Sequence, residues 1–260
     1  MACAQLAPVL GDGAGNASRA RACIDAAAAA GVDVVVLPEL ALSGYVFADQ
    51  AEARPLAVPP AALAQWARPG LVVVGGFAEL GASGALHNSA AIVDGSGVRA
   101  VYRKAHLWAR EPAIFAPGDD PPPVVDTEHG RVAAMVCFDL FFPEWVRLAA
   151  LAGAELLCVP GNWPRAPVPA GERPMQLLRA MVAAEANAMA VAICDRCGTE
   201  RGARWAGATG VAGPDGTLLA AARGFETELV VADVPPAADR GAWGAARRPE
   251  LYGGLAGPPR

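Results

Sequence analysis

Short apolar runs alternate along this chain with segments whose composition is typical of helices. The runs at 32–39, 71–77, 155–160 and 190–195 are rich in Val, Leu, Ile and Ala. A strand that is apolar on both faces must be covered on both faces, as in a sheet flanked by helices. This alternation constrains the fold more than any other feature, and it predicts an α/β chain. Asn16 is a candidate N-cap for the first helix.

Each half of the chain also contains a segment that predicts a β-hairpin. Residues 88–104 place two strand-like runs around Asp-Gly-Ser-Gly, and residues 207–222 turn at Pro-Asp-Gly. The order helix, strand, helix, strand, hairpin therefore recurs approximately in both halves. Two mixed sheets stacked face to face, with helices outside, would account for this pattern, although periodicity alone does not prove the stacking.

Composition and charge narrow the classes of protein to which the chain can belong. Its 260 residues are 54% apolar, which suits one globular domain or two closely fused halves, and we expect 1–260 to form a single domain. The net charge of −5 and the scattered basic residues argue against a nucleic-acid partner. The tail 235–260, rich in Pro, Gly and Arg, is expected on the surface or against a partner subunit.

Targeting signals and cysteine usage predict the compartment. The N-terminus lacks the pattern of a signal peptide, and no apolar run is long enough to cross a membrane, so we expect no membrane partner. Several of the six cysteines lie inside apolar runs, which is typical of reduced thiols in a cytoplasmic protein.

Three predicted strands end in an ionisable residue. Glu39 follows one apolar run, Lys104 follows the first hairpin, and Cys137 follows the run that starts at 131. Sites in α/β sheets collect at strand ends, where loops begin. An acid, an amine and a thiol at one place are sufficient for nucleophilic acyl transfer. Taken singly, each residue has an ordinary structural reading: a solvated acid, a surface amine or a buried thiol.

The local contexts of these residues change that reading, because together they resemble the nitrilase, or carbon–nitrogen hydrolase, superfamily. The matching segments occur in the order of that family and span nearly the whole chain. They are LPELALSGY (37–45), YRKAHL (102–107), EPAIFAPGD (111–119), VCFDLFFPE (136–144), GNWP (161–164) and RRPELY (247–252).

The resemblance implies a four-layer α-β-β-α sandwich with two mixed β-sheets and a Glu-Lys-Cys triad. Glu39 matches the general base, Lys104 the lysine and Cys137 the nucleophile. Glu111 matches a supporting second glutamate, with Glu128 and Glu144 as nearby alternatives. The implied reaction needs no metal or organic cofactor. The tail segment RRPELYGGL (247–255) resembles family segments that pack across a dimer, so the resemblance implies a homodimer or a higher homo-oligomer.

Simple acid–base chemistry explains why the three groups are needed together. Moving the proton of an ordinary thiol to an ordinary carboxylate is uphill by about 4.2 pKa units, or ~5.7 kcal/mol. We expect burial to raise the pKa of Glu39 and the ammonium of Lys104 to lower the pKa of Cys137. The backbone N–H of Phe138, which follows the nucleophile at the turn, is the expected second oxyanion donor. Asp139 is expected to organise that turn.

The substrate is predicted less sharply than the reaction. Tyr45, Phe141, Asn162 and Trp163 are candidate substrate-binding residues, with ordinary packing as the alternative role. Many family members carry Arg at the position of Phe141, and its loss favours an apolar acyl group. True nitrilases typically have Trp-Glu after the cysteine, where this chain has Phe-Asp. The resemblance therefore favours small linear amides or N-carbamoyl compounds over nitriles.

Three other readings stay open from the sequence. A Cys-His hydrolase would use His106, which we interpret as structural. The segment CDRC (194–197) could be a redox or zinc site, but two incidental thiols are the simpler interpretation. A non-catalytic binding protein could retain the fold.

Overall fold

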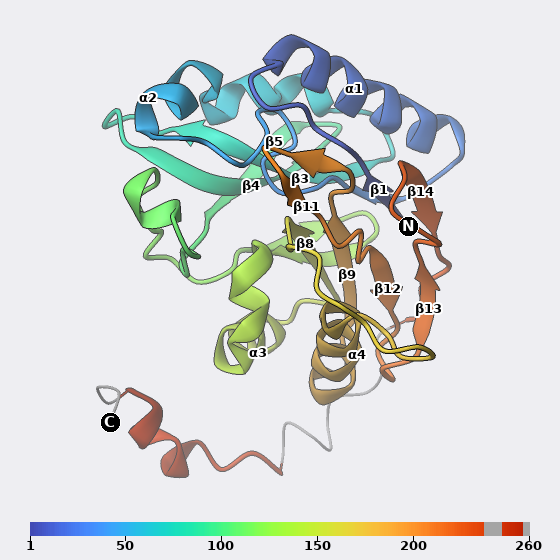
Figure 1. Cartoon of the computed structure of the whole chain (residues 1–260). Coiled ribbons are helices and arrows are strands. Elements are labelled where there is room, and N and C mark those ends of the chain that lie inside the picture. The colour runs from blue at the N-terminus through green and yellow to red at the C-terminus, as the bar shows by residue number, and fades with distance from the viewer. Residues whose placement is uncertain (237–245, 257–260) are drawn as a thin grey trace.

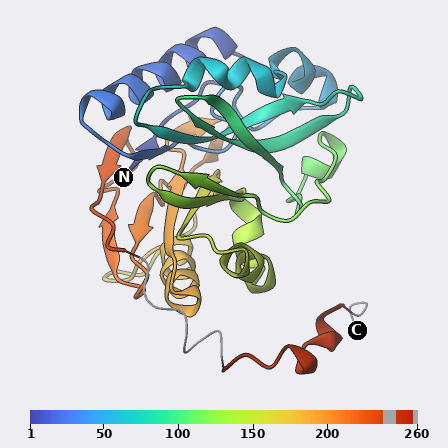
Figure 2. The ribbon, with the colours of Figure 1, turned by 180° about the vertical axis from the view of Figure 1, so that it is seen from behind.

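Two six-stranded sheets stack face to face, with helices on their outer faces (Figure 1). The computed structural model describes residues 1–236 and 246–256. The four-layer α-β-β-α sandwich with two mixed sheets, predicted from the sequence, is confirmed. Seen from behind, the first helix covers one outer face and the later helices cover the other (Figure 2).

The two sheets repeat one strand pattern. The first has the order β14 (Glu228–Val231), β1 (Ala2–Gln5), β2 (Val34–Val36), β3 (Val72–Leu80), β4 (Leu86–Asp94), β5 (Gly97–Arg103). The second has the order β13 (Leu218–Ala221), β12 (Gly210–Ala212), β9 (Ala190–Asp195), β8 (Leu156–Gly161), β7 (Gly130–Ala134), β6 (Val124–Thr127). In each sheet three parallel strands (β1–β2–β3 and β7–β8–β9) lead into an antiparallel hairpin (β4–β5 and β12–β13). The recurring order expected from the sequence is therefore present.

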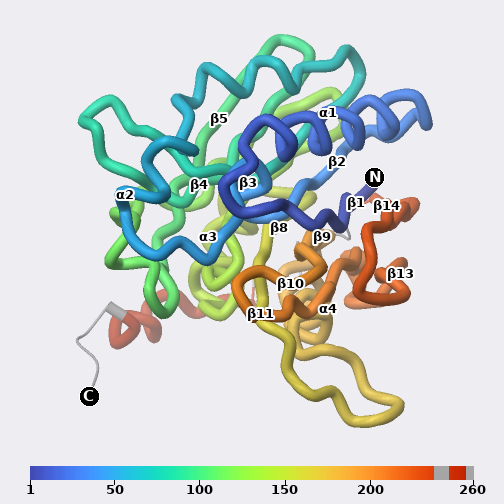
Figure 3. The backbone as a smooth tube through the Cα atoms, turned by 45° about the horizontal axis from the view of Figure 1, so that its top comes forward, coloured from blue at the N-terminus to red at the C-terminus, as the bar shows by residue number. Residues whose placement is uncertain are grey.

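The helices differ in type between the two halves. The α-helices are α1 (Gly13–Ala29), α2 (Gln50–Ala53), α3 (Pro143–Leu151) and α4 (Met175–Asn187). The proline-led segment PPAALAQWA (59–67), whose composition predicts a helix, forms the 3-10 helix η2 (Pro60–Trp66), which is preceded by the short η1 (Arg54–Leu56). A small hairpin, β10 (Thr199–Glu200) and β11 (Ala203–Arg204), lies outside both sheets (Figure 3).

The first helix begins earlier than the sequence predicted. Asp12 is its N-cap, and the Asp12 carboxylate accepts a hydrogen bond from the N–H of Gly15 at 2.9 Å. Asn16, the predicted cap, is buried in the first turns, where its side chain pairs with both backbone groups of Val9. Asp and Asn can both cap a helix. Because the side chain of Asn16 is bonded to the backbone of Val9, Asp12 is the residue that caps α1.

The alternation of side chains along the first sheet divides the core between two layers. On β2, Val34 and Val36 face the second sheet, whereas Val35 packs with Ile24 of α1 and Trp66 of η2. Because successive residues of a strand point to opposite faces, a continuous apolar run supplies both layers at once.

Part of the predicted interface tail falls within the described residues. Of 235–260, residues 237–245 and 257–260 lie outside them. The described part forms the 3-10 helices η5 (Pro249–Leu251) and η6 (Gly253–Ala256) and lies away from the two sheets (Figure 1). Leu251 and Leu255 there are 65% and 71% exposed, which leaves an apolar surface uncovered. No helix in the described part of the chain has the length and hydropathy of a membrane span.

Candidate active site

The side chain of Lys104 lies between two buried carboxylates. Its Nζ is 2.7 Å from Oε1 of Glu39 and 2.8 Å from Oε1 of Glu111. All three side chains are at most 4% exposed. The structure thus brings together three residues that the sequence separates by as many as 72 positions, from Glu39 to Glu111.

Strand ends and a close backbone approach position these groups. Glu39 follows β2, Lys104 directly follows β5, and Glu111 begins the 3-10 helix η3 (Glu111–Ala113). Gly76 on β3 runs against Glu39, and a Cβ at this glycine would come within 2.5 Å of the Glu39 Cα. Glycine therefore lets the neighbouring strand approach the carboxylate-bearing loop.

Asn88 on β4 is a further polar member of the cluster that we did not predict from the sequence. Its Nδ2 donates to Oε1 of Glu39 at 2.7 Å and to Oε1 of Glu111 at 3.2 Å. Its carbonyl accepts the N–H of Lys104 at 2.8 Å. The run of three buried polar residues that β4 contains, His87, Asn88 and Ser89, is the local signal that could have identified it.

Cys137 lies at a sharp turn that follows the second-sheet strand β7. It begins the 3-10 helix η4 (Cys137–Phe141), and its φ of +50° lies in the left-handed region. Residues other than glycine rarely adopt this backbone conformation, and those that do cluster at functional sites. The Asp139 carboxylate holds the turn by accepting the N–H of Val136 at 3.1 Å and the hydroxyl of Tyr102 at 2.8 Å.

The protonation state of the site follows from burial and from the neighbouring charges. Burial raises the pKa of Glu39 to about 7, against the opposing charge of Lys104, and the charge of Glu111 adds to the increase. Burial by itself would lower the pKa of Lys104, but the charges of Glu39, Cys137 and Glu111 raise it above its ordinary value. Lys104 is therefore an ammonium, and Glu39 titrates near neutral pH.

The pKa of the Cys137 thiol differs from the lowered value that we expected. Burial raises the pKa of Cys137 well above its ordinary value, and the charge of Glu39 adds to this increase. Lys104 and the backbone N–H of Asn162 lower this pKa, as expected for a nearby ammonium and a donor, but they do not outweigh the loss of hydration. The resting site therefore holds a neutral thiol beside a carboxylate and an ammonium.

His106, the candidate base of a Cys-His hydrolase, is held by Asp139. Its Nδ1 is 2.7 Å from Oδ1 of Asp139, and its backbone N–H donates to the same oxygen at 3.0 Å. Its ring stacks on Phe142 with the centroids 3.7 Å apart. Within the described residues no hydrogen bond joins His106 to Cys137, and these contacts favour a structural role.

Two of the four predicted substrate-binding residues, Tyr45 and Asn162, donate hydrogen bonds to glutamates of the cluster. The hydroxyl of Tyr45 donates to Oε1 of Glu111 at 2.8 Å. Nδ2 of Asn162 donates to the carbonyl of Glu39 at 3.1 Å. The side-chain oxygen of Asn162 and the indole nitrogen of Trp163 are buried and have no partner among the described residues.

The phenylalanines after the nucleophile pack against one another, with the ring centroids of Phe138 and Phe141 5.0 Å apart. The N–H of Phe138 is in the first turn of η4, where backbone donors lack partners within the helix. Phe141 is 37% exposed, and its ring lies under the guanidinium of Arg179 at 3.7 Å, in the groove between α3 and α4. The structure therefore does not bring Phe141 into the cluster around Lys104.

The remaining sequence candidates lie apart from the cluster. Glu128 is exposed next to His129, and Glu144 is exposed in the first turn of α3. The thiols of CDRC are buried, with Cys194 on the carbonyl of Ala4 at 3.2 Å. Among the described residues no group of three or more His, Cys, Asp or Glu is arranged to hold a metal ion.

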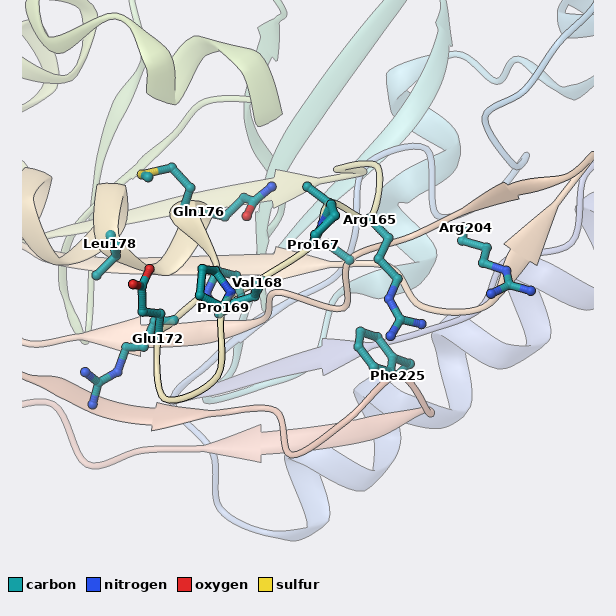
Figure 4. Close-up of a pocket in the computed structure, with 14 residues that line it drawn as sticks. Arg165, Pro167, Val168, Pro169, Glu172, Gln176, Leu178, Arg204 and Phe225 are labelled. Atoms are coloured by element: carbon teal, nitrogen blue, oxygen red, sulfur yellow. The ribbon is translucent and has the colours of Figure 1, made fainter.

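A cavity of about 690 Å³ has none of Glu39, Lys104, Glu111 and Cys137 in its lining. It is lined by the loop that follows Trp163, by Arg204 and by Phe225, whose ring carries the guanidinium of Arg165 at 3.8 Å (Figure 4). Ala206, which also lines it, donates its N–H to the carbonyl of Trp163 at 2.8 Å.

Comparisons with known proteins agree on one family. The sequence model of the carbon-nitrogen hydrolase family matches residues 1–243. A nitrilase from Pyrococcus abyssi is 37% identical over 84% of this chain and 83% of its own. An (R)-stereoselective amidase from a Pseudomonas species is 35% identical over 87% of this chain and 82% of its own. A solved mutant of the amidase from Nesterenkonia sp. AN1, with an acetamide moiety added covalently at its active-site cysteine, superposes with a TM-score of 0.82 at 27% identity, covering 96% of this chain and 94% of its own.

Proposed function

The chain belongs to the carbon-nitrogen hydrolase family, and within it we propose that the protein hydrolyses small linear amides or N-carbamoyl compounds through a cysteine thioester. One observation carries this proposal: an ammonium is held between two buried carboxylates, and its charge and that of Glu39 act on the pKa of the buried Cys137 thiol, which lies at a left-handed turn. We assign Glu39 as the base, Cys137 as the nucleophile, and Lys104 with Glu111 as the charged support.

The proposed reaction begins at the neutral thiol. Glu39 accepts the proton of Cys137 as the sulfur attacks the carbonyl carbon, and the new oxyanion is stabilised by Lys104 and the N–H of Phe138. Glu39 returns the proton to the nitrogen as the C–N bond breaks, so ammonia or an amine leaves and a thioester remains. Glu39 then takes a proton from water as its oxygen attacks the thioester. When the C–S bond breaks, Glu39 returns this proton to the sulfur, and the carboxylic acid leaves.

The raised pKa of the free thiol fits this sequence. Because the proton stays on sulfur until a substrate carbon arrives, the site does not carry a reactive thiolate at rest. The raised pKa of Glu39 makes this carboxylate a stronger base than an ordinary one. Asn162 supports the same step from its backbone, since its N–H lowers the pKa of Cys137.

Ammonia release from matched panels of aliphatic amides, N-carbamoyl compounds and nitriles tests the proposal. We expect turnover in the amide or carbamoyl panel, because Phe-Asp rather than Trp-Glu follows the nucleophile and an amidase is among the similar structures. Turnover of nitriles alone would move the assignment to a nitrilase, which the Pyrococcus relative makes the second candidate. No turnover in any panel would favour a non-catalytic binding protein.

The pH dependence of kcat/KM should follow the ionisation of Glu39. The base must be unprotonated, and burial raises its pKa to about 7, so kcat/KM should rise with pH through a midpoint near 7. Glu111→Gln removes a negative charge that raises the pKa of Glu39, so the midpoint should move to lower pH in the residual activity of this variant. A wild-type midpoint at the ordinary carboxylate value of about 4.3 would contradict the assignment of Glu39.

We also propose a cytoplasmic homodimer of this single 1–260 domain, formed through the α3–α4 face and the tail. Exposed apolar side chains on that face support it: Leu148, Leu151, Met175 and Val182 are 41%, 53%, 56% and 66% exposed. The six free cysteines are consistent with a reducing compartment. Light scattering should give the dimer mass for the wild type and the monomer mass for Val182→Glu; a monomeric wild type would refute the dimer.

A further inference from the structure

Two charged residues with no part in the proposed chemistry form a buried ion pair behind the cluster. Arg196 lies inside the CDRC segment and Glu200 ends β10, and they are 1% and 7% exposed. Nη1 of Arg196 is 2.8 Å from Oε2 of Glu200. An ion pair that has lost its water stabilises a fold only weakly, so its presence needs another explanation.

The carboxylate of Glu200 binds the backbone next to a residue of the cluster. Its Oε1 accepts the N–H of Tyr45 at 2.9 Å and the N–H of Val46 at 2.5 Å. Gly44 leaves room for this contact, because a Cβ at Gly44 would come within 2.8 Å of Oε2 of Glu200 and 2.5 Å of the Cα of Leu10. Glu200 therefore anchors the main chain at Tyr45.

The guanidinium of Arg196 supports the same tyrosine from the side of its ring. Nη2 of Arg196 donates to the carbonyl of Pro8 at 2.5 Å, and its Cζ lies 5.0 Å from the ring centre of Trp205. The Trp205 ring meets the Tyr45 ring edge to face, with centroids 5.3 Å apart. Tyr45 is thus fixed at its backbone by Glu200 and at its ring by Trp205.

The free end of Tyr45 then reaches the charged cluster. Its hydroxyl donates to Oε1 of Glu111 at 2.8 Å, and this oxygen also accepts from Nζ of Lys104 at 2.8 Å. Burial raises the pKa of Tyr45 well above its ordinary value, so the phenol remains a neutral donor. A displaced phenol would leave Glu111, and through it Lys104, less firmly held.

We propose that Arg196 and Glu200 are positioning residues, which hold Tyr45 so that its hydroxyl fixes the Glu111 oxygen shared with Lys104. The proposal rests on the proposed function, because the ammonium it positions is the one assigned to thiolate and oxyanion stabilisation. The proposal also gives the CDRC segment a structural role through Arg196, which does not involve its two thiols.

A double-mutant cycle tests whether Glu200 acts through the Tyr45 hydroxyl. Glu200→Ala should lower kcat about tenfold in the wild-type background, an effect of one good hydrogen bond. In the Tyr45→Phe background, where the hydroxyl is already absent, the same change should lower kcat less than about twofold. Equal effects in both backgrounds, or an unchanged kcat in Glu200→Ala, would overturn the proposal.

Conservative and control variants separate positioning from folding. Glu200→Gln retains an oxygen that can accept the N–H of Tyr45, so kcat should return to within about threefold of wild type even if the melting temperature falls. If Glu200→Ala does not fold, the apolar pair Arg196→Met with Glu200→Leu replaces it, since such pairs often retain stability. Glu52→Ala is the matched control, because the Arg201–Glu52 pair links the same two segments without contacting Tyr45; its kcat should be unchanged.

A substrate-free measurement distinguishes failure of this inference from failure of the proposed function. Site-resolved alkylation of Cys137 by iodoacetamide reports on the charges around the sulfur and needs no amide. The rate constant and its pH profile should change in Glu200→Ala and stay constant in Glu52→Ala. If no amide is turned over but this pattern holds, the positioning stands without the assigned reaction; if amides are turned over and the pattern is absent, the positioning is wrong.

Discussion

Replacing Cys137 with alanine is expected to lower kcat for the best amide substrate by at least about 10⁴-fold, since removing a catalytic nucleophile leaves only binding and oxyanion stabilisation. The side chain is small and buried, so the fold should persist. The measurement is ammonia release at saturating substrate, together with a melting curve. Mass spectrometry of the wild type, quenched during turnover, should find the acyl adduct on the peptide that contains Cys137.

His106→Ala is the matched control for this loss. His106 contacts Asp139 rather than the sulfur, so kcat should fall by less than about tenfold, through the turn that Asp139 holds. If the folded His106→Ala enzyme were as inactive as Cys137→Ala, a Cys-His mechanism would replace the assignment of Glu39. An active Cys137→Ala enzyme would remove the thioester altogether.

Replacing Lys104 with methionine should abolish activity and destabilise the fold by about 3–5 kcal/mol at neutral pH, the cost typical of removing one partner from a buried ion pair. The reason is local: the ammonium lies 2.7 and 2.8 Å from two carboxylate oxygens that have almost no access to water. Urea unfolding at neutral pH measures the loss. A stability equal to that of the wild type would mean that these carboxylates are not ionised together.

The destabilisation by Lys104→Met should also depend on pH in a defined direction. Lys104 lowers the pKa of Glu39, so its removal should raise this pKa further above the ordinary value of a carboxyl in the unfolded chain. A carboxyl with a raised folded pKa stabilises the fold at low pH and loses this contribution as pH rises. The variant should therefore regain stability between about pH 8 and pH 5. Adding Glu39→Gln, which removes one buried charge, should recover part of the loss at pH 8.

The alternation of buried strands with helices and the positions of ionisable residues after strand ends could be predicted because they rest on local patterns. A buried strand is recognised by its own apolar residues, and its end is recognised by the polar residue that follows, as with Glu39 and Lys104. The ends and the types of the helices could not be predicted as closely as the strands. The cap of α1 is Asp12 rather than Asn16, and residues 60–66 form a 3-10 helix, since tertiary contacts select among several acceptable local conformations.

The supports of the site could not be predicted, because they join residues that no local pattern relates. Asn88 reaches Glu39 across 49 positions, and Glu200 reaches Tyr45 across 155. A hydrogen bond needs two atoms within about 3 Å, and sequence spacing does not specify that distance for segments in different parts of the fold. The same limit explains why Phe141 was expected in the site and lies in the groove between α3 and α4.

By itself, the sequence determined the alternation of buried strands and helices and the residues that carry the charge and the thiol, since side-chain type and apolar periodicity are properties of the chain. Its resemblance to one family implied the four layers. Only the tertiary structure decided how those groups are protonated and held. The pKa of Glu39 near 7, the neutral thiol of Cys137 and the anchoring of Tyr45 all depend on burial and on distances between remote segments. Hydration and Coulomb energies are set by those distances, and folding alone fixes them.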